Sequence, residues 1–186
     1  IEFPKNKNDI FAPDKSGRMP YSDHFKLADD FISHLDGAIG GIADPFIRSR
    51  YVGFIAVSAA TVFELAVKDI LCSFAAKKHK ILGTFAGGYF ERLNGQIGRD
   101  RIENKYLPLF GDKYVDRFRK RLEVAELACL RVDSVSIKSS YGNLLTWRHG
   151  FAHEGVIPAN ATYEEVKKSY LYGRKLIDCL SDAMQR

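Results

Sequence analysis

Apolar residues recur every three or four positions over most of the chain, which is the spacing of amphipathic helices. Between residues 21 and 39 this spacing is continuous, and Gly40 with Gly41 provides a stop. A second helix is expected from Pro45 to about Lys80, because Asp44 can cap it and proline fits the first helical position. No segment has the convincing alternation of a β-strand.

The middle of this second helix is apolar on nearly all sides. Between Tyr51 and Val67 the only charged residue is Glu64. A helix of this kind is normally surrounded by other elements, so we expect it at the centre of the fold. The run is short for a membrane span and contains Glu64, so we reject a membrane location. A core-facing Glu64 needs a partner, whereas on an exposed stripe it would need none.

The pattern is weaker after this helix and then recovers. Residues 84–108 are glycine-rich and predict only short helical pieces, over 89–93 and 101–107. A longer helix is expected over residues 112–130. Its basic cluster, Arg117 to Arg121, is not confined to one side, so we interpret it first as a solvated face and only second as an RNA contact.

Two further helices complete the prediction. Asp133 or Ser134 can cap a helix that runs through Trp147 and ends at Gly155. The last helix opens at Thr162 with a capping box. We therefore expect an all-α fold, a helical bundle with a long central helix, in one domain over residues 21–186 after an irregular arm over residues 1–20.

The charge and the cysteine content do not change the predicted fold. The net charge is +5, a modest excess that permits nucleic acid as a partner without requiring it. Cys72, Cys129 and Cys179 lie far apart in apolar helical stretches and lack metal-ligand spacing. We expect buried thiols, a reducing cytoplasmic setting and no cofactor.

Arg148 and His153 are the strongest candidates for chemistry. Arginine can hold a phosphate and histidine can move a proton, and together these steps can cut RNA without a metal. Five residues advance a regular helix by about 500°, which places the two side chains about 140° apart. They can converge on one phosphate only if the helix distorts or finishes near Gly150, or if a second copy completes the site across a two-fold axis. The second option predicts a homodimer.

Other interpretations of this segment stay open. His149 and His153 share a helical face and could hold a metal with Glu154 or Glu64, although the glutamate of HExxH is missing. A purely structural interpretation pairs Arg148 with Glu64 and leaves both histidines as polar residues at a helix end.

The segment Leu144–Gly155 resembles the signature of the HEPN superfamily, an arginine followed by a polar residue and, four to six positions after the arginine, by a histidine. Phe63 to Lys68 resembles the helix that supplies the acidic residue of that superfamily. The resemblance extends from about Tyr21 to Met184 and is most similar to the RiboL-PSP branch. His149 departs from the pattern, since family members more often carry asparagine or aspartate there.

This resemblance implies a helical dimer that acts as a metal-independent RNA endonuclease. Arg148 would bind the scissile phosphate, and His153 would move the proton of the 2′-hydroxyl or of the leaving oxygen. His149 would orient the phosphate or serve as a second acid-base group, and Glu64 would hold Arg148 in place. The family also implies a toxin or antiviral-defence effector with an antitoxin or regulatory partner. The alternative is a non-catalytic dimerisation or nucleic-acid-binding module with the same fold.

Overall fold

The computed structural model describes residues 20–158 and 161–185, and every regular element in this part of the chain is helical. The expected all-α class is therefore confirmed. Apart from Pro20, the arm expected over residues 1–20 lies outside the described residues. In chain order the elements are η2 (Pro20–His24), α1 (Phe25–Ala38), η3 (Ile39–Gly41), α2 (Pro45–Lys78), α3 (Lys80–Phe90), α4 (Arg99–Arg101), η4 (Ile102–Tyr106), η5 (Leu107–Phe110), α5 (Asp112–Asp133), α6 (Ile137–Glu154) and α7 (Tyr163–Met184).

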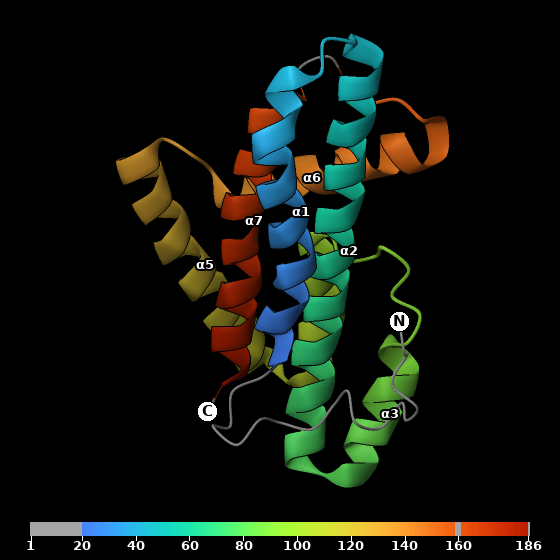
Figure 1. Ribbon diagram of the computed structural model, residues 1–186. Helices are drawn as coiled ribbons and strands as arrows, with labels where there is room; N and C mark the ends of the chain where they lie inside the picture. The colour runs from blue at the N-terminus through green and yellow to red at the C-terminus, as the bar shows by residue number, and fades with distance from the viewer. Residues whose placement is uncertain (1–19, 159–160, 186) are drawn as a thin grey trace.

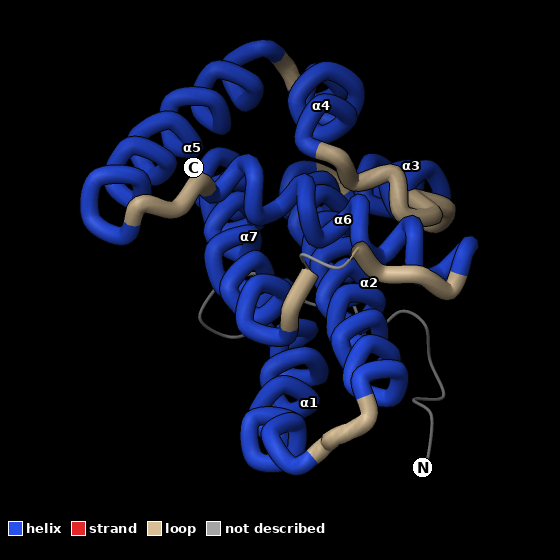
Figure 2. The backbone as a smooth tube through the Cα atoms, turned by 90° about the horizontal axis from the view of Figure 1, so that it is seen from above, coloured by secondary structure: helices blue, strands red, loops and turns tan. Residues whose placement is uncertain are grey.

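Helix α2 is the central element, as its apolar middle predicts. It contacts α1, α3, α6 and α7 (Figure 1). Seen from above, α2, α6 and α7 occupy the middle, with α1 on one side and α5 on the other (Figure 2). Asp44 caps α2 as expected, because its carboxylate accepts hydrogen bonds from the N–H groups of Phe46 and Ile47.

Three aromatic rings join the central helices. Phe63 of α2 stacks on Tyr141 of α6 and on Tyr170 of α7, with ring centroids 5.4 and 5.8 Å apart. All three side chains are fully buried. Gly173 lets α7 approach closely, since a Cβ there would lie 3.2 Å from the Cα of Tyr141. This stack fixes α6, the helix that carries the Arg148 motif, against α2.

Hydrogen bonds connect α7 to α1. The hydroxyl of Tyr170 donates to Asp29, and the hydroxyl of Tyr163 and the ammonium of Lys167 both bind Asp36. The Lys167 and Tyr163 hydrogen bonds, with Lys167 the larger cause, hold the pKa of Asp36 below its usual value. These bonds fix α1 on the side of α7 away from α5 (Figure 2).

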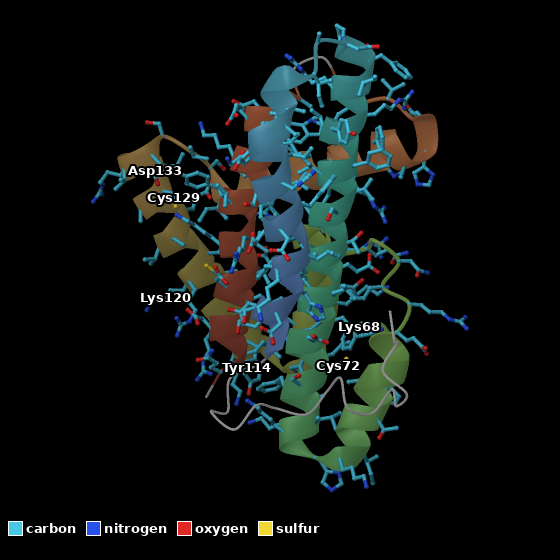
Figure 3. All side chains as sticks on the ribbon, in the orientation of Figure 1. Lys68, Cys72, Tyr114, Lys120, Cys129 and Asp133 are labelled. Carbon is cyan, nitrogen blue, oxygen red and sulfur yellow. The ribbon has the colours of Figure 1, made fainter. Side chains whose placement is uncertain are left out.

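The three cysteines are free and buried, as expected. Cys72 lies on the half of α2 that runs beside α3, and Cys129 lies on α5, where it accepts a 3.1 Å hydrogen bond from Lys175 (Figure 3). Burial raises the pKa of Cys72 and of Cys179 from 9.0 to about 11, so both thiols stay protonated at neutral pH.

The sequence-based boundaries were wrong in two places. A complete helix, α3, begins at Lys80 and continues into the glycine-rich segment to Phe90, where only a short piece over residues 89–93 was expected. The cap of α6 is Ser136 rather than Asp133 or Ser134, because Asp133 still belongs to α5 and Ser134 turns left-handed with φ of 54°. Glu126 of α5 fixes the new cap by accepting hydrogen bonds from Ser136 and from the N–H of Lys138.

Candidate functional site

Helix α6 is unbroken through the candidate motif. It continues four residues beyond Gly150 and ends at Glu154, where Gly155 takes the left-handed cap with φ of 65°. The stop at Gly155 is confirmed, and the option of a helix that finishes near Gly150 is wrong. Within one chain, Arg148 and His153 therefore keep the angular separation of about 140° that a regular helix imposes.

The half-buried guanidinium of Arg148 lies against the backbone of Gly95. A Cβ at position 95 would stand 2.7 Å from Nη1 and 2.9 Å from Nη2 of Arg148. Gly95 also has φ of 74°, a conformation that L side chains rarely adopt. Two features therefore require glycine at position 95: the positive φ of the turn and the guanidinium of Arg148 that lies against it.

Glu64 reaches the same glycine from the opposite helix. Its Oε2 accepts a 2.7 Å hydrogen bond from the N–H of Gly95, which gives this half-buried carboxylate the partner that the sequence called for. Among the ion pairs of the described residues, none joins Glu64 to Arg148. Glu64 and Arg148 therefore contact the same glycine, and the direct pairing that the structural interpretation expected is not among the ion pairs of the described residues.

Two tyrosines fix the residues that follow Gly95. The hydroxyl of Tyr106 donates to the carbonyl of Gln96, and the hydroxyl of Tyr141 donates to the carbonyl of Ile97, each at 2.7 Å. Burial, and then the charge of Glu64, raises the pKa of Tyr141, so this phenol stays a neutral donor. Residues 95–97 are consequently held by α2, η4 and α6 together.

His149 and His153 lie together on the exposed side of α6. Their ring centroids are 4.5 Å apart, as expected for residues four positions apart on a helix. Glu64 is engaged at Gly95, and in residues 20–158 and 161–185 no three metal-binding side chains cluster. The histidine pair therefore lacks the third protein ligand that the metal interpretation needs.

Arg50 ties the end of this helix to α2. Its guanidinium donates to the carbonyl of Gly155 and lies 4.6 Å from the ring centroid of Phe46. Phe151 packs on Gly53, where any Cβ would overlap its ring at 2.2 Å. The two histidines are thus presented on a helix end that is fixed to the central helix.

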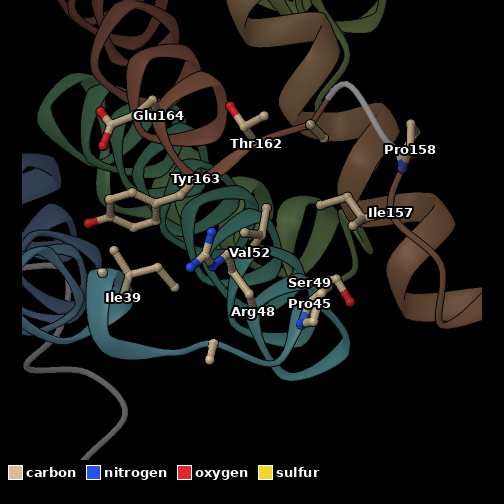
Figure 4. Close-up of a pocket in the computed structure, with 13 residues that line it drawn as sticks. Ile39, Pro45, Arg48, Ser49, Val52, Ile157, Pro158, Thr162, Tyr163 and Glu164 are labelled. Carbon is tan, nitrogen blue, oxygen red and sulfur yellow. The ribbon is translucent and has the colours of Figure 1, made fainter.

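A pocket of about 460 Å³ lies next to this end of α6 (Figure 4). It is lined by the start of α2, including Arg48 and Val52, and by the segment that enters α7, including Tyr163 and Glu164. Arg48 is engaged at the carbonyl of Ile42. None of the four candidate residues lines this pocket, which therefore belongs to a different part of the surface.

Four residues that build the site were missed from the sequence, namely Gly95, Tyr106, Tyr141 and Arg50. Gly95 carried a usable signal, since Asn94-Gly95 is a turn pair and both residues have positive φ. Tyr141 occupies an apolar position of its helix, and its hydroxyl partner lies 44 residues away, so no local pattern indicates the bond. Arg50 had no local signal, because its partner Gly155 is 105 residues distant.

The protein-family model described as RiboL-PSP-HEPN matches residues 22–186. Comparison with curated proteins and with solved structures gave no match. None of the helices in the described residues combines the length and the apolar character that a membrane span needs. The match covers α1 to α7 and includes all four candidate residues.

Proposed function

The chain belongs to the RiboL-PSP-HEPN family, and on this premise we propose that it is a metal-independent RNA endonuclease whose active site is completed by a second copy of the chain. The observation that carries the proposal is the guanidinium of Arg148 lying over Gly95, beside exposed histidines on one unbroken helix. Arg148 and His153 face different directions within a chain, so a two-fold partner is the arrangement that brings them to one phosphate.

The proposed chemistry uses three side chains. Arg148 binds the scissile phosphate, and His153 of the second copy takes the proton of the ribose 2′-hydroxyl. The 2′-oxygen attacks phosphorus, the bond from phosphorus to the 5′-oxygen breaks, and His149 returns a proton to the leaving oxygen. The products are a 2′,3′-cyclic phosphate and a 5′-hydroxyl end.

Preorganisation of Arg148 supports this role. Arg148 is half-buried, and its guanidinium lies against a loop that hydrogen bonds to Glu64, Tyr106 and Tyr141 hold in place. A donor that is already in position loses little free energy to reorganisation when charge develops on the phosphate. Such groups are worth roughly 3–4 kcal/mol of transition-state stabilisation in other enzymes.

Cleavage in the presence of EDTA tests the proposal. The wild type is expected to cut RNA and leave cyclic phosphate ends, and Arg148→Ala and His153→Ala are expected to lose at least about 100-fold in rate. Exposed residues of the same types, in Arg131→Ala and His34→Ala, serve as matched controls and should retain activity. Absence of cleavage by the wild type, or full activity of both site variants, would contradict the proposal.

The same experiment separates the non-catalytic alternative. A dimerisation or nucleic-acid-binding module would leave RNA intact, and its self-association would be indifferent to His153→Ala. We further propose that the nuclease acts in the cytoplasm as a toxin or antiviral-defence effector, restrained by an antitoxin or regulatory partner. The support is the family match, together with the exposed position of His149 and His153, which a partner protein could cover.

A further inference from the structure

Helix α3 has one buried face and one exposed face. Gly83, Ala86 and Phe90 face the core, and Gly83 approaches so closely that a Cβ there would stand 2.8 Å from Ala76 of α2. On the other side, Ile81 and Phe85 are 73% and 70% exposed. Helix α3 lies beside α2 at the edge of the molecule, so no described element covers this face (Figure 1).

The exposed face ends in two aromatic rings. Phe85 and Tyr89 lie one helical turn apart, and their rings are nearly parallel, with an interplanar angle of 17° and centroids 6.5 Å apart. Tyr89 is itself 44% exposed. Burying such rings is favourable, and flat exposed rings of this kind are the platforms on which unpaired bases stack.

Positive charge is concentrated around the same helix. Residues 70–101 contain six lysines and arginines and two acidic residues, a net charge of +4 out of +5 for the whole chain. Lys80 at the start of α3 and Arg92 just after its end are both exposed. A partner that stacks on the rings while neutralising this charge must combine planar apolar groups with negative charge. A nucleic acid has both.

The α3 face leads directly to the candidate active site. Helix α3 runs back along α2 from Lys78 towards Lys68, whose ammonium donates to the carbonyl of Glu91, and Lys68 follows Glu64 by one helical turn (Figure 3). Gly95, four residues beyond Glu91, is the glycine covered by Arg148. Burial raises the pKa of Tyr106, the residue that binds the carbonyl of Gln96 next to Gly95.

We propose that the α3 surface, made of Ile81, Phe85 and Tyr89 with Lys80 and Arg92, binds single-stranded RNA next to the phosphate held by Arg148. This inference rests on the proposed nuclease function and specifies its substrate as an unpaired strand. The rings need free base faces, which a duplex hides within its own stack. Lys80 and Arg92 bind phosphates on either side of the stacked bases, and the strand continues past Lys68 to Gly95.

Binding to an RNA that cannot be cut tests the surface separately from catalysis. The probe is a fluorescent 15-nucleotide 2′-O-methyl oligouridine, because methylation blocks attack by the 2′-oxygen. The double variant Phe85→Ala/Tyr89→Ala is expected to bind this probe at least about 10-fold more weakly than wild type. Leu127→Ala/Val132→Ala removes two exposed apolar side chains from α5 instead and should bind like wild type.

Salt dependence and strandedness give two further expectations. Lys80→Gln/Arg92→Gln should reduce the slope of log affinity against log salt concentration by about 1.4, since each phosphate contact on a single strand contributes about 0.7. A 15-base-pair duplex should bind more weakly than the single strand, and Phe85→Ala/Tyr89→Ala should not weaken it further. Circular dichroism verifies that each variant is folded.

The outcomes separate this inference from the proposed function. If Phe85→Ala/Tyr89→Ala binds the oligouridine as tightly as wild type, the α3 surface does not bind RNA. If the double variant changes only the sedimentation coefficient of the protein and not its affinity for RNA, the α3 surface makes protein contacts instead. This outcome would also overturn the inference. Cleavage of a dinucleotide, which is too short to reach α3, should be unchanged by the double variant. A wild type that binds through α3 but cuts no RNA would overturn only the nuclease.

Discussion

At the scale of single residues, Gly95 explains how the site is organised. Glu64 binds its N–H group, Arg148 covers its α-carbon, and its backbone has φ of 74°. Sequence reasoning selected Glu64 and Arg148 from their helices and from a family resemblance. The Asn94-Gly95 pair indicates a turn, but the sequence does not place that turn between the other two residues, because 31 residues separate Glu64 from Gly95 and 53 separate Gly95 from Arg148.

Replacing Gly95 by alanine should impair catalysis more than folding. The left-handed backbone costs a side-chain-bearing residue about 1–2 kcal/mol, and the new methyl group must displace the guanidinium of Arg148. We expect a lower free energy of unfolding by this amount in urea titrations, and a loss of at least about 10-fold in kcat/KM for RNA.

Gly111→Ala is the matched control. Its φ is 111°, yet no atom lies within 4 Å of an added Cβ, so it should lose stability without losing activity. Equal activities of Gly95→Ala and wild type would show that the position of Arg148 over residue 95 is irrelevant to catalysis.

At the scale of elements, two of the three expected caps were predictable and packing was not. Asp44 and Thr162 cap α2 and α7 as their sequences indicate, because a cap depends on residues two or three positions apart. Helix α3 was missed because Gly83, Gly87 and Gly88 lower helix propensity, whereas the close approach of Gly83 to Ala76 makes glycine useful there. Contacts across 20 or more residues leave no periodic signal.

Two glycine substitutions should have opposite effects on the helices. In Gly53→Ala the new methyl group overlaps the ring of Phe151 and forces α6 away from α2, so we expect about 1–3 kcal/mol of destabilisation. In Gly142→Ala the methyl group meets nothing within 4 Å inside α6, and better helix propensity should add about 0.5–1 kcal/mol. Urea unfolding of both variants measures the difference; equal midpoints would refute this account of α2–α6 packing.

At the scale of the whole molecule, the side chains of Arg148 and His153 point in different directions from one unbroken helix. A site composed of groups from two copies of the chain therefore has a testable consequence. Arg148→Ala and His153→Ala should each be nearly inactive alone, whereas in a mixed dimer of the proposed kind one of the two sites keeps both wild-type groups. Random exchange makes half of the dimers mixed, so about a quarter of wild-type cleavage should return on mixing. No recovery after verified subunit exchange would exclude a site shared in this way.

The folded chain should also lose stability in alkali. Burial raises the pKa of Cys72 and Cys179 to about 11 and raises the pKa of Tyr163 and Tyr170 as well. Each neutral form is favoured by folding, so the contribution is complete below pH 9 and is lost as pH rises towards 11 and beyond. Urea midpoints measured from pH 7 to 11 should fall above pH 9. A constant midpoint over that range would contradict the raised values.

The loop of residues 95–97 has a consequence for the order of biosynthesis. Its anchors come from α2, η4 and α6, and Tyr141 and Arg148 are the last of them to leave the ribosome. Until α6 has left the ribosome and packed against α2, the guanidinium of Arg148 cannot lie against this loop, and the proposed nuclease cannot act. A growing chain should therefore be unable to cut RNA until the residues of α6 have left the ribosome.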